Sequence, residues 1–164
     1  MSDTPSPDLL YVAFDPGHNT GIAAWCDPTE NPIVFGHEAD FQGVIHFLSK
    51  LELQMNLPVV IVIEEYRVWD DKKGSKELTI QVIGAIKGWC LKHEIPLVEQ
   101  RPTVRRTASA WSGVPWPKGH MPDWMSAFLH GYYYLHKNKL DKRSRVLEER
   151  RPLGASIVEN EPRE

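Results

Sequence analysis

Two acidic residues stand at the ends of predicted strands. Asp15 directly follows an apolar run over residues 9–14, and Glu64 directly follows a β-branched run over residues 59–63. Carboxylates at the ends of neighbouring buried strands are well placed to form a site at the edge of a sheet. Each also has a plainer interpretation, because an Asp often starts a turn and the residue after a strand often meets solvent. Glu65 competes with Glu64, but strand alternation points the two to opposite faces, so only one can join Asp15.

A second polar pair, His120 and Asp123, surrounds the start of a predicted helix. Pro122 is tolerated only in the first turn of a helix, so the helix begins near this residue. Three-residue spacing lets both side chains reach one point, although Asp123 alone would also complement the helix dipole. Together with Asp15 and Glu64, the pair supplies three carboxylates and an imidazole, which suit Mg²⁺ or Mn²⁺ rather than structural zinc. Two such ions can activate a water and stabilise the leaving oxygen in phosphodiester hydrolysis.

Charge is distributed unevenly along the chain. The formal net charge is −3 and the isoelectric point is near 6.2, whereas domains that bind nucleic acid are usually basic. Residues 1–66 nevertheless sum to −9, and residues 67–151 sum to +8. This asymmetry indicates a basic face that would hold a polyanionic substrate beside an acidic site. Ordinary solvated helix faces are the alternative interpretation.

The order of predicted elements indicates an α/β fold with a mixed sheet flanked by helices. Three strands joined by hairpins come first, and helices and strands alternate after them. The expected strands span residues 9–14, 22–26, 32–39, 59–63 and 96–98. The expected helices span residues 41–51, 75–93, 103–111 and 123–136, with Asp40 as the cap of the first. The domain is expected over residues 9–139, between a disordered tail at residues 1–8 and a charged tail at residues 140–164.

Composition excludes several classes of protein. The chain has 164 residues, which suits one domain, and its mean hydropathy is −0.39. No apolar run approaches the roughly 20 residues of a membrane span, and residues 1–8 lack the pattern of a signal peptide. Cys26 and Cys90 are too few for a disulfide scaffold or a zinc site, so they are expected to be small buried hydrophobes. These features predict a soluble intracellular protein.

Four short motifs, in the order in which they occur, resemble those of RuvC-type Holliday junction resolvases of the ribonuclease H-like superfamily. The motifs are residues 14–23 (FDPGHNTGIA), 62–64 (VIE), 104–107 (VRRT) and 120–123 (HMPD). With similar segments at residues 84–88 and 95–99, the resemblance covers about residues 9–135. It implies a ribonuclease H-like mixed five-stranded sheet with helices on both faces. Compact members of this family occur in phages, which implies the cytoplasm of a bacterium or of a phage-infected cell.

The resemblance also implies the site, the cofactor and the partners. Asp15, Glu64, His120 and Asp123 would be the catalytic residues and the ligands of two Mg²⁺ ions, for which Mn²⁺ would substitute. The reaction would be hydrolytic nicking of paired strands across a DNA junction, a crossover junction endodeoxyribonuclease activity. The substrates would be Holliday junctions and other branched DNA such as flaps or forks. The enzyme would be a homodimer whose contact helix is residues 75–93.

Several residues of the basic segment are expected to contact DNA. The family usually has Lys where this chain has Arg105, and Arg binds phosphate but is a poorer proton donor. It also places an aromatic residue after the second acid, for which Tyr66 and Trp69 are candidates. The stretch between Arg106 and His120 is shorter here and rich in Trp and Pro. The expected DNA contacts are Tyr66, Arg67, Trp69, Lys72, Lys73, Lys76, Arg105, Arg106 and Lys118.

Other functions were weighed against this one. A related nuclease of the same fold processes pre-ribosomal RNA, but Pro16 and the pair His120 and Asp123 favour the resolvase. A branched-DNA binder without catalytic activity is a further alternative, although all four expected ligands are present. ATPases of the actin and sugar-kinase type need two such domains, which this chain is too short to supply.

The remaining aromatic and histidine residues have weaker interpretations. Trp111 and Trp116 either contact DNA or pack within a loop, and loop packing is the commoner role of a Trp beside Pro. Residues 132–134, three tyrosines, either stack on bases or belong to the core and its rim. His130 and His136 lie six residues apart, on different faces of a helix, and are not counted as ligands.

Overall fold

The structure is a computed structural model that describes residues 9–26, 31–54, 56–66 and 76–149. Within them, the elements follow the order β-β-β-α-β-α-β-α-α, which confirms the predicted order. The strands are β1 (Leu10–Asp15), β2 (Thr20–Cys26), β3 (Val34–Ala39), β4 (Val59–Glu64) and β5 (Leu97–Gln100). The helices are α1 (Phe41–Gln54), α2 (Lys76–Lys92), α3 (Val104–Ser112) and α4 (Asp123–Glu149).

The strands form one mixed sheet in the order β3-β2-β1-β4-β5. The hairpin-connected pairs β1–β2 and β2–β3 are antiparallel, whereas β4 runs parallel to both β1 and β5. Phe14 of β1 lies opposite Ile63 of β4. The next residues along these strands, Asp15 and Glu64, therefore emerge at the same edge of the sheet.

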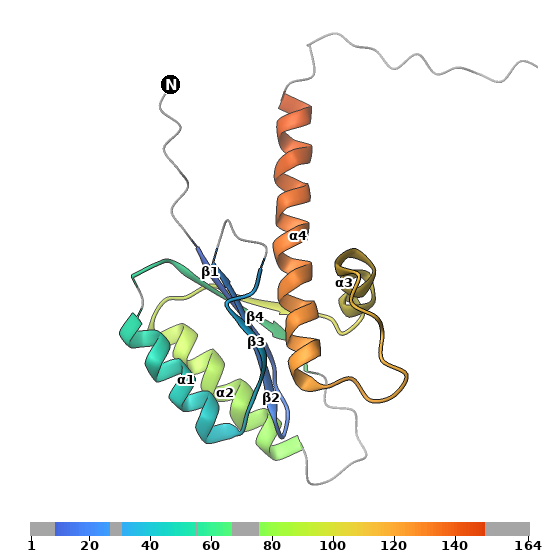
Figure 1. The fold of residues 1–164 in the computed structure, drawn as a ribbon. Coiled ribbons are helices and arrows are strands. Elements are labelled where there is room, and N and C mark those ends of the chain that lie inside the picture. Colours follow the sequence, from blue (N-terminus) through green and yellow to red (C-terminus); the bar gives the residue numbers. More distant parts are fainter. Residues whose placement is uncertain (1–8, 27–30, 55, 67–75, 150–164) are drawn as a thin grey trace, which may run out of the picture. The chain divides into compact units, whose positions relative to one another are not determined.

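Helices cover both faces of the sheet, as predicted (Figure 1). Val12, Phe14 and Ile22 pack with α1 and α2 in the larger core, which also contains Cys90. Burial raises the pKa of the Cys90 thiol to about 11, consistent with a small buried hydrophobe. Alternate residues point to α4 on the other face, where the rings of Trp25 and Phe128 lie 5.6 Å apart.

The helix ends agree with the predictions except in α4. Asp40 caps α1, since its Oδ1 accepts a hydrogen bond of 2.8 Å from the N–H of Gly43. The last helix was predicted to end near residue 136 but continues to Glu149. Residues 132–151 contain no Pro or Gly, so nothing in this stretch terminates the helix.

The chain divides into two units, residues 1–134 and residues 135–164, and the boundary falls within α4. The site described below lies within the first unit. Residues 1–8, predicted to be a tail, and residues 150–164 of the predicted charged tail lie outside the described residues.

In the part of the chain that the structure describes, no helix is both long and apolar enough to cross a membrane.

Candidate active site

Strand alternation places Asp15 and Glu64 on the face of the sheet that α4 covers. A Cβ built on Gly131 of α4 would lie 3.0 Å from the Cβ of Ala13, so Ala13 faces this helix. Asp15 is two residues further along β1 and points to the same side. Glu64 faces α4 as well, because its Oε2 lies 2.7 Å from Nε2 of His130.

Glu65 is turned away from this site. Its Oε2 lies 3.8 Å from Nε of Arg101, and its backbone N–H donates to the carbonyl of Gln100 at 2.7 Å. The choice between the two acids, open in the sequence, is decided by the direction of the side chains. Glu64 is the neighbour of Asp15.

Asp123 reaches the same edge because Gly21 has no side chain. A Cβ on Gly21 would lie only 1.9 Å from the carbonyl oxygen of Asp123, so the start of α4 packs directly on β2. Gly21 also pairs with Asp15 in the β1–β2 ladder, which places Asp123 beside Asp15. Burial raises the pKa of Asp123, and the charges of Glu38 and Glu64 raise it further.

Asp15 is hard to ionise at this edge. Burial, which is the largest cause, and the charges of Glu64 and Asp123 together raise the pKa of Asp15 to about 7. A hydrogen bond with Ser126 and the charge of Arg105 lower it, but they do not compensate. The carboxylates therefore outweigh the nearby positive charge, and a bound cation would relieve their repulsion.

His120 is the most exposed of the four predicted ligands. Its side chain is exposed, and its charge lowers the pKa of Asp123, against the effect of burial. In residues 9–26, 31–54, 56–66 and 76–149, no three His, Cys, Asp or Glu side chains converge closely enough to hold a metal ion. Carboxylate oxygens are nevertheless the ligands that hard divalent cations such as Mg²⁺ prefer.

Glu64 is fixed by side chains from two helices. Oε2 of Glu64 lies 2.7 Å from Nε2 of His130 and 3.4 Å from Nη1 of Arg105. The other ring nitrogen of His130, Nδ1, lies 2.9 Å from the side-chain amide of Gln100. His130 and Gln100 are both buried, and burial lowers the pKa of His130. An imidazole held at both nitrogens orients the carboxylate beside it.

The spacing between His130 and His136 gives no indication that His130 belongs to the site. His130 and His136 do lie on different faces of the helix. Asp123, Ser126 and His130, however, are spaced by three and four residues and share one face of α4. This spacing was the available indication that His130 belongs with Asp123.

Glu38 is a second missed residue near the site. It lies opposite Gly21 in the β2–β3 ladder, and its Oε1 accepts a hydrogen bond of 3.3 Å from the N–H of Trp124. Its charge is the second largest cause of the raised pKa of Asp123, after burial. Only the strand register brings Glu38 to this edge, so no motif in the sequence could have identified it.

The predicted DNA contacts fall into three groups. Arg105 turns inward, with Nη1 3.0 Å from Oγ of Ser126 and 3.4 Å from Oε2 of Glu64. Arg106, Lys118 and Tyr66 are exposed, and Lys76 is the first residue of α2. The remaining four lie outside the described residues: Arg67, Trp69, Lys72 and Lys73.

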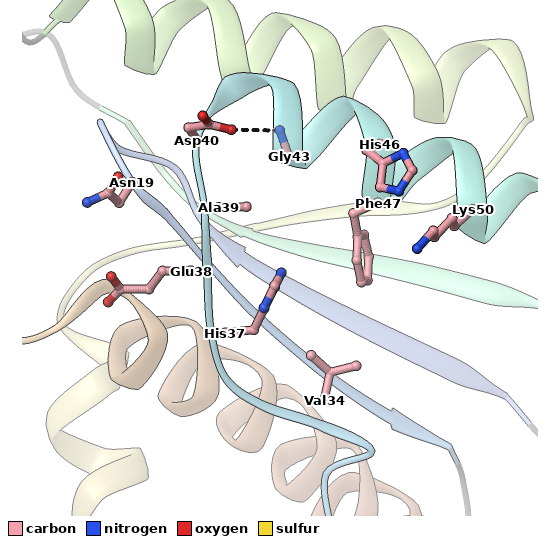
Figure 2. Close-up of a pocket in the computed structure, with 10 residues that line it drawn as sticks. All are labelled: Asn19, Val34, His37, Glu38, Ala39, Asp40, Gly43, His46, Phe47 and Lys50. Carbon is pink, nitrogen blue, oxygen red and sulfur yellow. Dashed lines mark hydrogen bonds between the residues drawn. The ribbon is translucent and has the colours of Figure 1, made fainter.

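A surface pocket lies on the other side of β3 from this site, between β3 and α1 (Figure 2). Figure 2 shows His37 and Glu38 extending from β3 in opposite directions. His46, Phe47 and Lys50 of α1 form the facing wall. Glu38 lines the pocket and also lies near Asp123, so the pocket borders the carboxylate edge through this residue, although Asp15, Glu64 and Asp123 do not line it.

Comparison with solved structures finds the same fold in a resolvase. The chain is similar to Thermus thermophilus RuvC in complex with a Holliday junction substrate, with a TM-score of 0.60 and 9% identity, over 80% of this chain and 96% of that one. A second Thermus thermophilus RuvC structure gives a TM-score of 0.57 and 11% identity, again over 80% of this chain and 96% of the other. No protein-family model and no curated protein sequence matches the chain. The likeness confirms the predicted ribonuclease H-like fold.

Proposed function

We propose that the protein is a metal-dependent endonuclease that resolves Holliday junctions or related branched DNA. The observation that carries the proposal is the grouping of Asp15, Glu64 and Asp123 at one sheet edge, where burial, together with the charges of Glu64 and Asp123, raises the pKa of Asp15 to about 7. The fold supports the same function, because a structure of similar fold, RuvC, is in complex with a Holliday junction. The acid-rich edge beside a basic segment suits a polyanionic substrate.

Asp15, Glu64, Asp123 and His120 would hold Mg²⁺, or Mn²⁺ in its place, with two ions in the complete site. Bound there, the ions would activate a water and stabilise the leaving oxygen of the cut phosphodiester. The residues of the chain have distinct tasks in this proposal. His130 holds the Glu64 carboxylate in one orientation through the 2.7 Å contact. Arg105, 3.4 Å from Glu64, supplies positive charge at the position where a substrate phosphate approaches.

The DNA would lie across the exposed cationic residues next to the site. Arg106 and Lys118 are exposed on the segment that joins β5 to α4, and Tyr66 follows Glu64 closely. We also propose DNA contacts from Lys76, the first residue of α2, and from four residues outside the described ranges: Arg67, Trp69, Lys72 and Lys73. These contacts go mainly to the phosphate backbone, so they set affinity more than sequence preference.

The proposed enzyme is a homodimer that associates through α2. Ile80 and Leu91 are 50% and 83% exposed on the outer face of this helix. Between them, a Cβ built on Gly84 or Gly88 would meet nothing within 4 Å. Apolar side chains beside two glycines allow a second helix to approach closely. Sedimentation equilibrium tests this association, and a monomer at every concentration would refute it.

Cleavage of a synthetic four-way junction tests the proposed reaction. Wild-type protein should cut the junction in Mg²⁺ or Mn²⁺, and Asp15→Asn should abolish cutting while its junction affinity is retained and its thermal stability is not reduced. Glu65→Gln is the matched control, since this acid faces away from the site. Failure to cut any branched DNA in either metal would refute the proposal. Preferential cutting of RNA would assign the site to RNA processing instead.

A further inference from the structure

The segment between Glu99 and Asp123 contains no acidic residue. It carries four basic residues: Arg101 before α3, Arg105 and Arg106 on α3, and Lys118 on the loop that follows it. Arg105 turns inward to the candidate site, whereas the next residue, Arg106, is exposed. Arg106 is therefore an exposed cationic side chain one residue away from a side chain of the candidate site.

Two tryptophans of this segment are partly exposed to solvent. The side chains of Trp111 and Trp116 are 43% and 38% exposed. The ring of Trp111 is parallel to that of Tyr133, with an interplanar angle of 3° and 5.4 Å between centroids. The guanidinium carbon of Arg106 lies 4.5 Å from the centre of the Trp116 ring. Each indole is thus supported by one defined neighbour and keeps ring surface open to a ligand.

The loop that contains Trp116 is held to α3 by hydrogen bonds. Gly113 ends the helix with a φ of 72°, and its N–H donates to the carbonyl of Ser109. The hydroxyl of Ser109 donates to the carbonyl of Val114 at 2.6 Å. Trp116 follows shortly and has a proline on each side. Because this backbone is already constrained, little conformational entropy is lost when a ligand binds to the ring.

We propose that Arg106, Trp111, Trp116 and Lys118 form an indole surface that binds unpaired nucleotides next to the branch point. The indoles stack on base faces, and the two cationic side chains contact phosphates. Paired duplex keeps its base faces stacked within the helix, so the ligand is single-stranded DNA at a gap, a flap or an opened junction arm. This inference rests on the proposed function, because it supposes that branched DNA lies at the neighbouring carboxylates.

Binding measured without divalent metal tests the indole surface. Fluorescence anisotropy, in EDTA, compares a labelled single-stranded DNA with the duplex of the same sequence. Trp111→Leu and Trp116→Leu should each weaken single-strand binding roughly tenfold and leave duplex binding unchanged. Trp116→Tyr keeps an aromatic face and should retain most of the affinity. Leu53→Ala is the matched control, because Leu53 is an 86% exposed apolar residue on α1.

The cationic half of the surface is tested by salt dependence. Arg106→Ala should weaken both ligands and reduce the slope of log affinity against log salt concentration by about one. An unchanged slope would place Arg106 away from the phosphates and overturn that part of the proposal.

Five outcomes decide whether the indole surface is refuted, and whether the proposed nuclease is refuted with it. Equal loss of single-strand and duplex binding in the Trp variants would refute stacking on bases, and so would equal affinities of Trp116→Leu and Trp116→Tyr. Tighter binding of single-stranded RNA than of DNA would refute the assignment to DNA. If the wild-type protein cuts junctions and the Trp variants bind single strands as tightly as wild type, the indole surface is refuted and the proposed nuclease is not. The expected losses in a protein that cuts nothing would support the surface and refute the proposed nuclease.

Discussion

Asp15 and Glu64 occupy equivalent positions at the ends of adjacent parallel strands, but their surroundings differ. Asp15 lies among other carboxylates, and burial together with the charges of Glu64 and Asp123 raises its pKa to about 7. Glu64 instead lies 2.7 Å from His130 and 3.4 Å from Arg105. Strand geometry places both acids at the same edge of the sheet. The side chains of α3 and α4 then give the two carboxylates different electrostatic surroundings.

The two acids therefore differ in what compensates their negative charge. Glu64 receives hydrogen bonding and positive charge from the protein itself, so its orientation is fixed within the fold. Asp15 receives too little of either to ionise easily, because Ser126 and Arg105 do not offset its burial. Under the proposed function, Asp15 depends on a bound cation and Glu64 depends on its protein neighbours. The predictions below separate these two dependences.

The largest expected effect comes from Gly21→Ala, which breaks the arrangement around Asp15. The new Cβ would lie 1.9 Å from the carbonyl oxygen of Asp123 and 2.7 Å from the backbone nitrogen of Trp124. Since both are backbone atoms, the start of α4 must move. We expect a loss of about 1–3 kcal/mol in the free energy of unfolding. Junction cutting should fall about 100-fold, because Asp123 leaves its position by a substantial fraction of an ångström or more.

Gly119→Ala is the stability control for this variant, because a Cβ at Gly119 would meet nothing within 4 Å. Thermal unfolding and single-turnover cutting are the measurements. A wild-type cutting rate in Gly21→Ala would mean that Gly21 does not determine the position of Asp123.

A smaller effect is expected when the support of Glu64 is removed. His130→Leu deletes the contact to Oε2 of Glu64 and should lower the cutting rate 10–100-fold, a range typical of residues that orient metal ligands. His130→Gln places an amide where Nε2 lies and should restore part of the rate. DNA affinity should be the same in both variants, because His130 is fully buried.

The pair of variants also controls for folding. Both replace a buried ring, so thermal unfolding reports any loss of stability that they share. If His130→Gln and His130→Leu cut at the same rate and are equally stable, His130 fills space and does not orient Glu64.

A third effect, on stability alone, is a dependence on pH that belongs to Asp15. Its folded pKa of about 7 lies above the ordinary value of 3.8, so between these values the native state binds more protons than the unfolded state. The stabilising contribution is fully present below pH 4 and is lost as the pH rises through about 7. At about 1.4 kcal/mol per pKa unit, wild-type protein in EDTA should lose a few kcal/mol relative to Asp15→Asn between pH 5 and pH 8.5.

Urea unfolding of both proteins across this pH range measures the difference. Addition of Mg²⁺ at pH 8.5 should stabilise wild-type protein more than Asp15→Asn. A constant difference between the two proteins at all pH values would show that Asp15 ionises normally.

The sequence predicted the fold well because its periodic patterns are local. The β-branched run before Glu64, the turn after Asp15 and the helical spacing of residues 75–93 each depend on neighbours along the chain. The end of α4 was the main error in the elements, because the sequence lacks a helix stop and polarity alone suggested a tail. The site was harder to predict, because its residues come from different strands and helices and approach one another only in the folded protein.

Patterns along the chain were sufficient to predict the order of elements and the acids that end β1 and β4, because strand and helix patterns arise from residues close together in the chain. The folded structure was needed to show that Glu64 rather than Glu65 lies beside Asp15, that Gly21 leaves room for Asp123, and that His130 and Glu38 lie at the same edge. These choices depend on side-chain direction, strand register and the close approach of α4 to the sheet. Such contacts join residues far apart in sequence, and the pKa of Asp15 is raised only once they have formed.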